Sequence, residues 1–311
     1  MSSSMPLPPT IRPPSWRSSL DLAGDPLSTA LDRAAQRLAG AGIDRALHEA
    51  RLLLAHLTGL SQARQIADPD HILGDDAQTQ FEDLIARRES HEPISHLTGE
   101  REFWSLPFSV SSAVLDPRPD SETLVAAALE NLPDPDRAYS VLDLGTGSGC
   151  LLLSVLKNRP KARGIGIDVS PEALRIAVQN ADRLALSRQA CFVCGDWGIA
   201  VNGLFDLILC NPPYIATHDL VKLAPEVARY EPRIGLDGGA DGLAAYRNLL
   251  PQLSRLLRSD GVAMVEIGAG QRADVAAIAK KFGLRVSQVY RDLAGIQRCL
   301  AVTCGAAFTV T

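Results

Sequence analysis

Near the start of the chain, apolar residues recur three or four positions apart, which is the spacing of one face of an α-helix. The first such face lies at Leu27, Leu31, Ala34, Ala35 and Leu38. Gly40 or Gly42 can end this helix, because glycine adopts the left-handed conformation that often follows a helix. Similar patterns predict helices near residues 44–57 and after Asp75-Asp76. We therefore expect a small helical domain over residues 26–91, suited to packing or to recognising a partner.

The pattern changes over residues 92–119, where aromatic residues stand among turn-forming residues. Phe103-Trp104 and Phe108-Ser109-Val110 are predicted to be strands. The turn between them is expected at Thr98-Gly99 or at Leu106-Pro107, because glycine and proline favour turns. This segment is therefore predicted to be a β-hairpin linker.

From residue 120 to residue 304, short apolar runs alternate with helical patterns. Asp120 or Ser121 is expected to cap the first helix, at residues 123–131. The predicted strands lie near residues 141–144, 164–168, 191–194, 205–210, 262–267, 284–290 and 298–303. The other predicted helices lie at residues 150–156, 242–257 and 271–282. Such alternation is typical of an α/β fold, here a Rossmann-like domain with a seven-stranded, mostly parallel sheet.

Composition agrees with a globular protein of one large and one small domain. The chain has 311 residues, of which 46% are hydrophobic and 22% charged. Its net charge of −5 disfavours extensive binding to a nucleic-acid backbone, which requires clustered Lys and Arg, so we expect no direct nucleic-acid partner. No apolar run is long enough for a membrane span, and no secretory signal is evident, so we expect a cytoplasmic protein without membrane contact.

The two ends and the cysteines carry no predicted chemistry. Residues 1–25 are rich in Ser and Pro and are predicted to be a disordered extension, with residues 305–311 as a tail. A transit peptide is the alternative for the extension, although its prolines disfavour an amphipathic helix. Cys191 and Cys194 form a single C-x-x-C without a second pair, so no metal site is expected. The cysteines are interpreted as buried free thiols in a reducing compartment.

A glycine-rich turn provides the first candidate site. Gly145-Thr146-Gly147-Ser148-Gly149 lies between the apolar run 141–144 and a helical pattern, so its backbone can approach a ligand closely. Asp168 ends the next predicted strand, 23 residues after Gly145, which is close to the spacing of a carboxylate that binds ribose hydroxyls. Asp196 and Trp197 follow a third strand and could bind an adenine amino group and stack on the ring. Because the dinucleotide motif is G-x-G-x-x-G, the G-x-G-x-G pattern here favours S-adenosylmethionine moderately.

Asn211-Pro212-Pro213-Tyr214 is the second candidate site. It directly follows the apolar run 205–210, and neither proline can donate to a strand ladder, so the strand should end here, at the sheet edge where α/β folds bind ligands. The Asn211 side-chain oxygen and a backbone carbonyl from Pro212 can each accept a hydrogen bond from one planar NH2 group, and Tyr214 can lie against its face. The segment therefore predicts a site for an amide or an exocyclic amine. Together with the glycine-rich turn, it favours a methyltransferase.

With these segments in place, the chain resembles the protein-(glutamine-N5) methyltransferases of peptide chain release factors, the PrmC/HemK family. The matching stretches run in the family's order from about Pro26 to Val302: Leu97–Trp104, Pro117–Glu122, Asp143–Gly149, Gly195–Trp197, Asn211–Tyr214, Tyr230–Pro232 and Arg291–Gly295. The Pro-Arg-Pro-Asp-Ser-Glu loop and the Asn-Pro-Pro-Tyr segment together are far more specific than either alone.

The resemblance implies methyl transfer from S-adenosylmethionine to the glutamine of the Gly-Gly-Gln loop of bacterial-type release factors. By position, it implies that Gly145, Thr146, Gly147, Ser148, Gly149, Asp168, Asp196, Trp197 and Asn211 hold the cofactor. It also implies that Asn211, Pro212, Pro213 and Tyr214 hold the glutamine, with Asn211, Pro212 and Tyr214 as catalytic residues, and that Phe103 and Arg118 help to close the pocket.

Two other functions use some of the same residues. A nucleic-acid methyltransferase for adenine or guanine amino groups could use the Asn-Pro-Pro-Tyr segment, with the base flipped into the site. A nucleotide-binding regulator or dehydrogenase would explain residues 145–168 but would leave residues 211–214 without a role.

Overall fold

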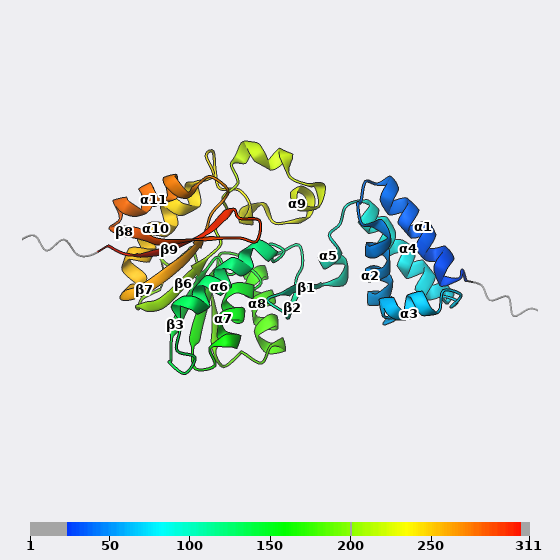
Figure 1. The fold of residues 1–311 in the computed structure, drawn as a ribbon, viewed down its shortest axis with the longest axis horizontal. Helices are drawn as coiled ribbons and strands as arrows, with labels where there is room; N and C mark the ends of the chain where they lie inside the picture. Colours follow the sequence, from blue (N-terminus) through cyan, green and yellow to red (C-terminus); the bar gives the residue numbers. More distant parts are fainter. Residues whose placement is uncertain (1–23, 200, 306–311) are drawn as a thin grey trace, which may run out of the picture. The chain divides into compact units, whose positions relative to one another are not determined.

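The computed structural model describes residues 24–199 and 201–305, which divide between Ser90 and His91 into two compact units (Figure 1). The extension predicted over residues 1–25 lies outside the described residues except for its last two positions, and only Gly305 of the predicted tail is described. In the described stretches, no helix combines the length and the apolar character that crossing a membrane requires. The predicted limits of the helical domain, the linker and the large domain stay predictions.

The first unit is helical. Its helices are α1 (Leu27–Gly40), α2 (Ala46–Thr58), α3 (Gln62–Ala67) and α4 (Asp75–Glu89). Helices α1, α2 and α4 contact one another and bury Leu38, Leu53 and Phe81. The short α3 was not predicted, because its six residues carry no complete apolar face. The sequence signal for it is Ser61, whose side chain accepts a hydrogen bond from the Arg64 amide at the helix start.

The second unit begins with α5 (Ile94–Thr98) and a hairpin of β1 (Glu100–Phe103) and β2 (Leu106–Ser109). The hairpin is confirmed, but both predicted turns are wrong. The turn consists of Trp104 and Ser105, whose φ angles of 53° and 56° are those of a type I′ turn. Thr98 and Gly99 instead end α5, and Trp104 is not a strand residue.

Pro107 lies inside β2 because of its place in the register. Phe103 pairs with Leu106 next to the two-residue turn, so Glu102 and Pro107 form the following pair. Hydrogen-bonded and non-hydrogen-bonded pairs alternate in an antiparallel ladder, and the pair next to a two-residue turn is bonded. The missing N–H of Pro107 therefore costs the hairpin no hydrogen bond.

The sheet of the second unit has seven strands in the order β5-β4-β3-β6-β7-β9-β8. The strands are β3 (Ser140–Leu144), β4 (Arg163–Asp168), β5 (Ala190–Cys194), β6 (Phe205–Cys210), β7 (Leu257–Glu266), β8 (Leu284–Arg291) and β9 (Gln297–Cys304). Strands β3 to β7 pair in parallel, and β9 runs antiparallel to both of its neighbours. The predicted seven-stranded, mostly parallel sheet is confirmed.

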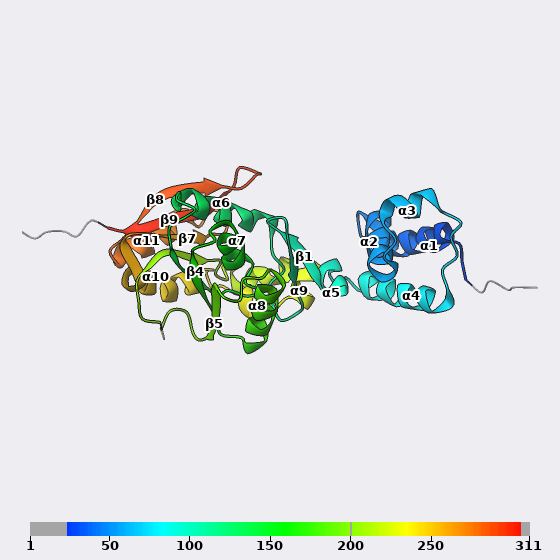
Figure 2. The ribbon, with the colours of Figure 1, turned by 90° about the horizontal axis from the view of Figure 1, so that it is seen from below.

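Helices cover both faces of this sheet (Figures 1 and 2). Helices α6 (Glu122–Asn131), α7 (Cys150–Asn158) and α8 (Pro171–Arg183) contribute to the core on one face. Helices α10 (Ala244–Leu256) and α11 (Arg272–Lys281) pack on the other face. Shorter segments are η1 (Pro119–Ser121), η2 (Thr217–Lys222), α9 (Pro225–Tyr230) and η3 (Arg233–Gly235). The strand order reverses between β3 and β6, which is where such sheets bind ligands.

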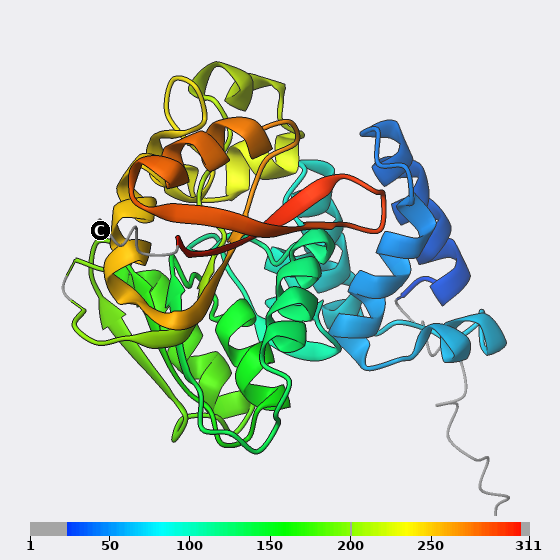
Figure 3. The same cartoon turned by 60° about the vertical axis from the view of Figure 1, so that its left-hand side comes forward.

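The hairpin of β8 and β9 forms one edge of the sheet and is coloured orange and red in Figure 3. Asp292 organises its connecting loop, since its Oδ1 accepts hydrogen bonds from the Ala294 and Ile296 amides at 3.0 and 2.9 Å. Its Oδ2 accepts from Arg298, whose guanidinium also bonds Asp120 at 3.1 Å. The hairpin loop is thereby tied to the start of α6.

Replacing Ser105 by glycine should stabilise the second unit. A left-handed conformation costs a side-chain-bearing residue roughly 1–2 kcal/mol, whereas glycine loses roughly 0.5–1 kcal/mol of backbone entropy, so the net gain should be about 0.5 kcal/mol. Urea unfolding of Ser105→Gly measures this gain. Ser109→Gly, in β2, is the control and should be destabilising; if both variants lose stability, the Ser105 conformation differs from the one described.

Candidate functional site

Four strand ends lie level with one another because of the sheet register. Leu144 pairs with Ile167 on one side and with Cys210 on the other, and Cys210 pairs with Val265. The residues one position further along are Gly145, Asp168, Asn211 and Glu266. The glycine-rich turn and the Asn-Pro-Pro-Tyr segment therefore leave adjacent strands at the same height.

Strand β4 holds the glycine-rich turn. The amides of Gly145 and Thr146 both donate to the Ile167 carbonyl, at 2.9 and 2.8 Å. The Gly147 amide donates to Asp168 Oδ2 at 2.8 Å, and the Ser170 amide donates to Asp168 Oδ1 at 2.9 Å. Each carboxylate oxygen keeps a second lone pair, so the half-buried Asp168 can still accept hydrogen bonds from ribose hydroxyls.

Trp197 lies beside the first glycine of the turn. A Cβ on Gly145 would lie 3.9 Å from the Trp197 ring, and one on Gly147 would have no atom within 4 Å. The half-buried Trp197 packs against the core formed with α10 and adopts a positive φ of 48°. Asp196 is exposed. The structure thus brings Trp197 to the turn and leaves Asp196 facing solvent.

Two buried polar atoms at this turn have no partner among the described residues: Asp143 Oδ1 and Ser148 Oγ. Asp143 Oδ2 accepts a hydrogen bond from Thr146 Oγ1 at 2.7 Å. Burial raises the pKa of Asp143 to about 7. Unpaired buried polar atoms next to a glycine-rich turn and an aromatic ring suit a polar, nucleoside-containing molecule such as S-adenosylmethionine.

The Asn-Pro-Pro-Tyr segment is held by its backbone. Gln271 Nε2 donates to the Tyr214 carbonyl at 3.0 Å and to the Gly242 carbonyl at 3.2 Å. A Cβ on Gly242 would lie only 2.5 Å from the Tyr214 carbonyl oxygen, so this position requires glycine. Pro212 is buried, whereas Asn211, Pro213 and Tyr214 are half-buried. The segment is thus fixed in place but remains accessible to a substrate.

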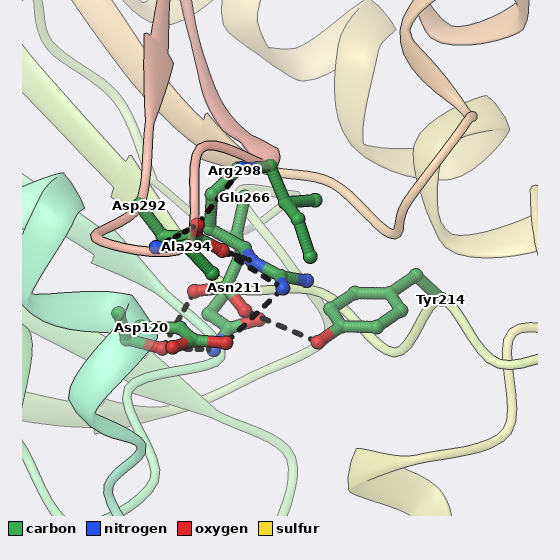
Figure 4. Close-up of polar contacts among 9 residues, drawn as sticks. Asp120, Asn211, Tyr214, Glu266, Asp292, Ala294 and Arg298 are labelled. Carbon is green, nitrogen blue, oxygen red and sulfur yellow. Dashed lines mark hydrogen bonds and ion pairs between the residues drawn. The ribbon is translucent and has the colours of Figure 1, made fainter.

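Glu266, the last residue of β7, is a buried carboxyl group beside this segment (Figure 4). Its Oε2 accepts a hydrogen bond from Ser121 Oγ at 2.6 Å, and its Oε1 accepts one from the Tyr214 hydroxyl at 3.3 Å. Asn211 Nδ2 donates to the same Ser121 Oγ at 3.1 Å. Burial raises the pKa of Glu266 to about 7 and raises the pKa of Tyr214 as well. Glu266 thus contacts Asn211 through Ser121 and contacts Tyr214 directly.

Ser121 takes the predicted cap position before α6, but its side chain makes no cap hydrogen bond. Its backbone is already helical, with φ −71° and ψ −12°, whereas the side chain of a capping residue reaches the helix amides from a non-helical backbone. Its hydroxyl donates to Glu266 instead. The Asp120 side chain bonds Arg298 instead. Asp and Ser are both common capping residues, but here their side chains make hydrogen bonds to β7 and β9 instead.

Of the two residues expected to close the pocket, one lies in the core. Phe103 is 1% exposed and packs edge-to-face on Phe108, with ring centroids 6.2 Å apart. Arg118 is half-buried and bonds Glu231 Oε1 at 2.5 Å, which links the loop before α6 to the segment after α9. The structure therefore brings Phe103 to the core and Arg118 to an ion pair.

The cysteines depart in part from the prediction. Cys210 and Cys299 are buried as expected, and Cys150 and Cys304 are partly buried. Cys191 and Cys194 are exposed, so burial was wrong for them. Their strand, β5, is at the edge of the sheet, where only one neighbouring strand covers it.

Sequence reasoning missed the roles of Ser121, Glu266, Gln271 and Arg298 in holding the site. Glu266 had a usable signal, because it is an acid near the end of the apolar run 262–267, where a buried strand reaches the ligand-binding edge. Gln271 and Arg298 lie at the start of a helix and of a strand and carry no distinguishing pattern.

Comparison with known proteins identifies both parts of the chain. Residues 29–99 match the family model described as the PrmC N-terminal domain, and residues 135–289 match a methyltransferase domain. The chain is 47% identical over 274 residues to the release factor glutamine methyltransferase of Rhodospirillum rubrum, covering 88% of this chain and 84% of that protein. It is 42% identical to the protein of the same name from Caulobacter vibrioides, covering 84% and 90% of the two chains.

A solved structure supports the fold alone. The hMettl16 catalytic domain, in complex with the MAT2A 3'UTR hairpin 6, is 16% identical with a TM-score of 0.51. The similarity covers 76% of this chain and 84% of that one. It agrees with a Rossmann-like methyltransferase fold.

The buried carboxyls should make stability depend on pH. Because the folded pKa values of Asp143 and Glu266 are about 7, above their usual 3.8 and 4.5, the folded state binds more protons than the unfolded state between these values. The free energy of unfolding should therefore be highest below about pH 4 for these groups and fall as pH rises through 7. Urea unfolding at pH 5 to 8 measures the slope, which should be flatter in Asp143→Asn and Glu266→Gln and flattest in the double variant. An unchanged slope in all three variants would contradict the raised pKa values.

Proposed function

Because this chain belongs to the family of release factor glutamine methyltransferases, we propose that it methylates the N5 side-chain nitrogen of the glutamine in the Gly-Gly-Gln motif of peptide chain release factors, with S-adenosylmethionine as methyl donor. One observation carries the proposal: the glycine-rich turn and Asn211 leave the adjacent strands β3 and β6 directly after the pair Leu144 and Cys210. A donor molecule on one strand end would thus lie next to an amide on the other. This proposal implies activity in the cytoplasm, where release factors terminate translation.

The cofactor would be held by the turn after β3 and by the ends of β4 and β5. Asp168 would accept hydrogen bonds from the ribose hydroxyls, Trp197 would contact the adenine ring, and the unpaired Asp143 Oδ1 would bind a polar group of the cofactor. Gly145 and Gly147 leave the space that a side chain would fill. When bound, S-adenosylmethionine supplies an electrophilic methyl group on a positively charged sulfur.

Asn211 and Pro212 would hold the substrate amide through its two N–H groups. An amide nitrogen is a poor nucleophile because its lone pair is delocalised. Acceptors at Asn211 Oδ1 and at the Pro212 carbonyl would orient the nitrogen toward the methyl group and stabilise the positive charge that develops on it. A strong base is unnecessary, because an alkylated amide nitrogen is acidic and loses its proton readily.

A neutral acceptor suits this position better than a carboxylate. A negative charge at residue 211 would attract the positively charged sulfur in the ground state as well as in the transition state. Such uniform binding does not accelerate the chemical step. Asn211 provides the acceptor without that charge, and the half-buried Tyr214 ring can lie against the face of the planar amide.

Two alternative functions account for fewer of the observations. A nucleic-acid amine methyltransferase would need the same Asn-Pro-Pro-Tyr segment, but the relatives at 42% and 47% identity carry the name of a protein-glutamine methyltransferase. A non-catalytic nucleotide-binding regulator would leave Asn211 without a function. Incubating the protein with labelled S-adenosylmethionine and, separately, a release factor, its Gly-Gly-Gln glutamine→alanine variant and nucleic acid distinguishes the three functions. Label on the glutamine→alanine variant would exclude the proposed activity, as would label on nucleic acid without label on the release factor.

Asn211→Ala should lower turnover by roughly 10²-fold or more, the cost of losing one preorganised polar contact in a transition state. The dissociation constant for S-adenosylmethionine should change much less, because the cofactor is held mainly by other residues. Mass spectrometry of the Gly-Gly-Gln peptide measures turnover, and calorimetry measures cofactor binding. Near-normal turnover in this variant would refute the assigned role.

Trp197→Ala should weaken cofactor binding about tenfold or more, since aromatic stacking on a base contributes roughly 1–3 kcal/mol. Calorimetric titration with S-adenosylmethionine measures the change. Trp104→Ala, which removes a half-buried indole from the β1–β2 turn, is the matched control and should bind the cofactor normally. Equal affinities in both variants would argue against an adenine contact at Trp197.

A further inference from the structure

A short chain of hydrogen bonds connects the buried Glu266 carboxylate to the Asn211 amide. Ser121 Oγ lies 2.6 Å from Glu266 Oε2, and Asn211 Nδ2 lies 3.1 Å from Ser121 Oγ. Three separate elements meet here: the end of β7, the residue before α6 and the residue after β6. Figure 4 shows Glu266 between Asn211 and Tyr214.

The donors and acceptors in this chain determine its direction. An ionised carboxylate has no proton to donate, so the Ser121 hydroxyl must donate to Glu266. The lone pairs of the same hydroxyl are then available to accept from Asn211 Nδ2. Asn211 Oδ1 consequently points away from Ser121, and within the described residues it accepts no hydrogen bond from the protein.

We propose that Glu266 and Ser121 are positioning residues that orient the Asn211 amide so that its oxygen, and not its NH2 group, faces the nitrogen that receives the methyl group. This rests on the proposed function, because a substrate amide presents N–H donors at that position. With the Asn211 amide inverted, two NH2 groups would face each other and no hydrogen bond could form. The two orientations of an Asn side chain have nearly the same shape, so packing alone does not select one.

The surroundings of Glu266 support a role in orientation more than a role in stability. A buried carboxylate without a hydrogen-bonded cation is costly, and well-packed apolar replacements of buried charges are often more stable. Among the described residues, the nearby Arg298 hydrogen-bonds Asp120 and Asp292, and both hydrogen-bond partners of the Glu266 carboxylate are hydroxyl groups. Each carboxylate oxygen takes one hydroxyl, so one side chain fixes Asn211 and Tyr214, the two ends of the Asn-Pro-Pro-Tyr segment.

Protonation of Glu266 would remove this direction, because a carboxyl group can also donate. The titratable groups near Glu266 are Asp120, Cys150, Cys210, Tyr214, Tyr246, Arg298 and Cys299. Burial raises the pKa of the three thiols and the two phenols further above neutrality, so these five groups stay uncharged near pH 7. The pKa of Glu266 itself is about 7. Turnover should therefore rise with pH as Glu266 ionises.

The test compares Ser121→Ala, Ser121→Thr and Glu266→Gln with wild-type protein in steady-state methylation of a release factor from pH 5.5 to 8.5. Ser121→Thr keeps the hydroxyl group. The control is Asp206→Asn, at the opposite end of β6, which alters another buried carboxylate with two hydrogen bonds, from Arg137 and the Ser140 amide. Thermal unfolding and calorimetric binding of S-adenosylmethionine are measured for each variant.

Ser121→Ala and Glu266→Gln should lower kcat roughly tenfold to a hundredfold, the range known for residues that orient metal-binding side chains. The KM for S-adenosylmethionine should stay close to wild type, and kcat should lose its rise near pH 7. Ser121→Thr should restore most of kcat, and Asp206→Asn should lose stability without a comparable loss of kcat. If kcat falls only in proportion to stability, or falls equally in Asp206→Asn, the positioning role is overturned.

A measurement without turnover separates this inference from the proposed function. The side-chain NH2 resonance of Asn211, assigned by its disappearance in Asn211→Ala, should shift as Glu266 titrates in wild-type protein and should not shift in Ser121→Ala. A wild-type protein that methylates no release factor would refute the function, while this titration would still decide the hydrogen-bond chain. A resonance that does not respond to pH in wild-type protein overturns the chain itself.

Discussion

The register of four parallel strands is the constraint on which the candidate site depends. Leu144, Ile167, Cys210 and Val265 pair across the middle of the sheet, so the residues that follow them leave the sheet at one height. Because the strand order reverses between β3 and β6, the connections from these two strands diverge and leave an accessible edge between them. A shift of one residue in any of these pairs would turn the site residues to the other face.

Burial gives this edge its chemistry. Asp143 and Glu266 are both almost fully buried beside it, and burial raises the pKa of each carboxyl to about 7. Buried carboxyl groups without a full set of hydrogen-bond partners lower stability. Groups with such shifted pKa values cluster at functional sites, and these two lie beside the candidate site. Arg298 and Asp120 add a second connection, between β9 and the residue that precedes Ser121, whose hydroxyl donates to Glu266.

Local sequence rules succeeded where neighbours along the chain decide the structure. The proline pair after residue 210 ends β6, and the alternation of apolar runs with helical patterns predicted the sheet and its covering helices except α8, which was missed. The rules failed where a side chain had two uses. Ser121 is a typical capping residue, but its helical backbone turns its hydroxyl to Glu266, and Pro107 looks like a turn residue although its place in the register makes it harmless in a strand.

By itself, the amino-acid sequence determined the α/β fold, the positions of the glycine-rich turn and the Asn-Pro-Pro-Tyr segment, and the resemblance to a methyltransferase family, because motifs and periodicity are local properties. Only the tertiary structure decided that Glu266 lies level with Asn211, that Ser121 connects them, and that Phe103 belongs to the core. These contacts join residues as far as 145 positions apart. No spacing rule specifies such pairs, since they depend on which strands lie next to one another in the sheet.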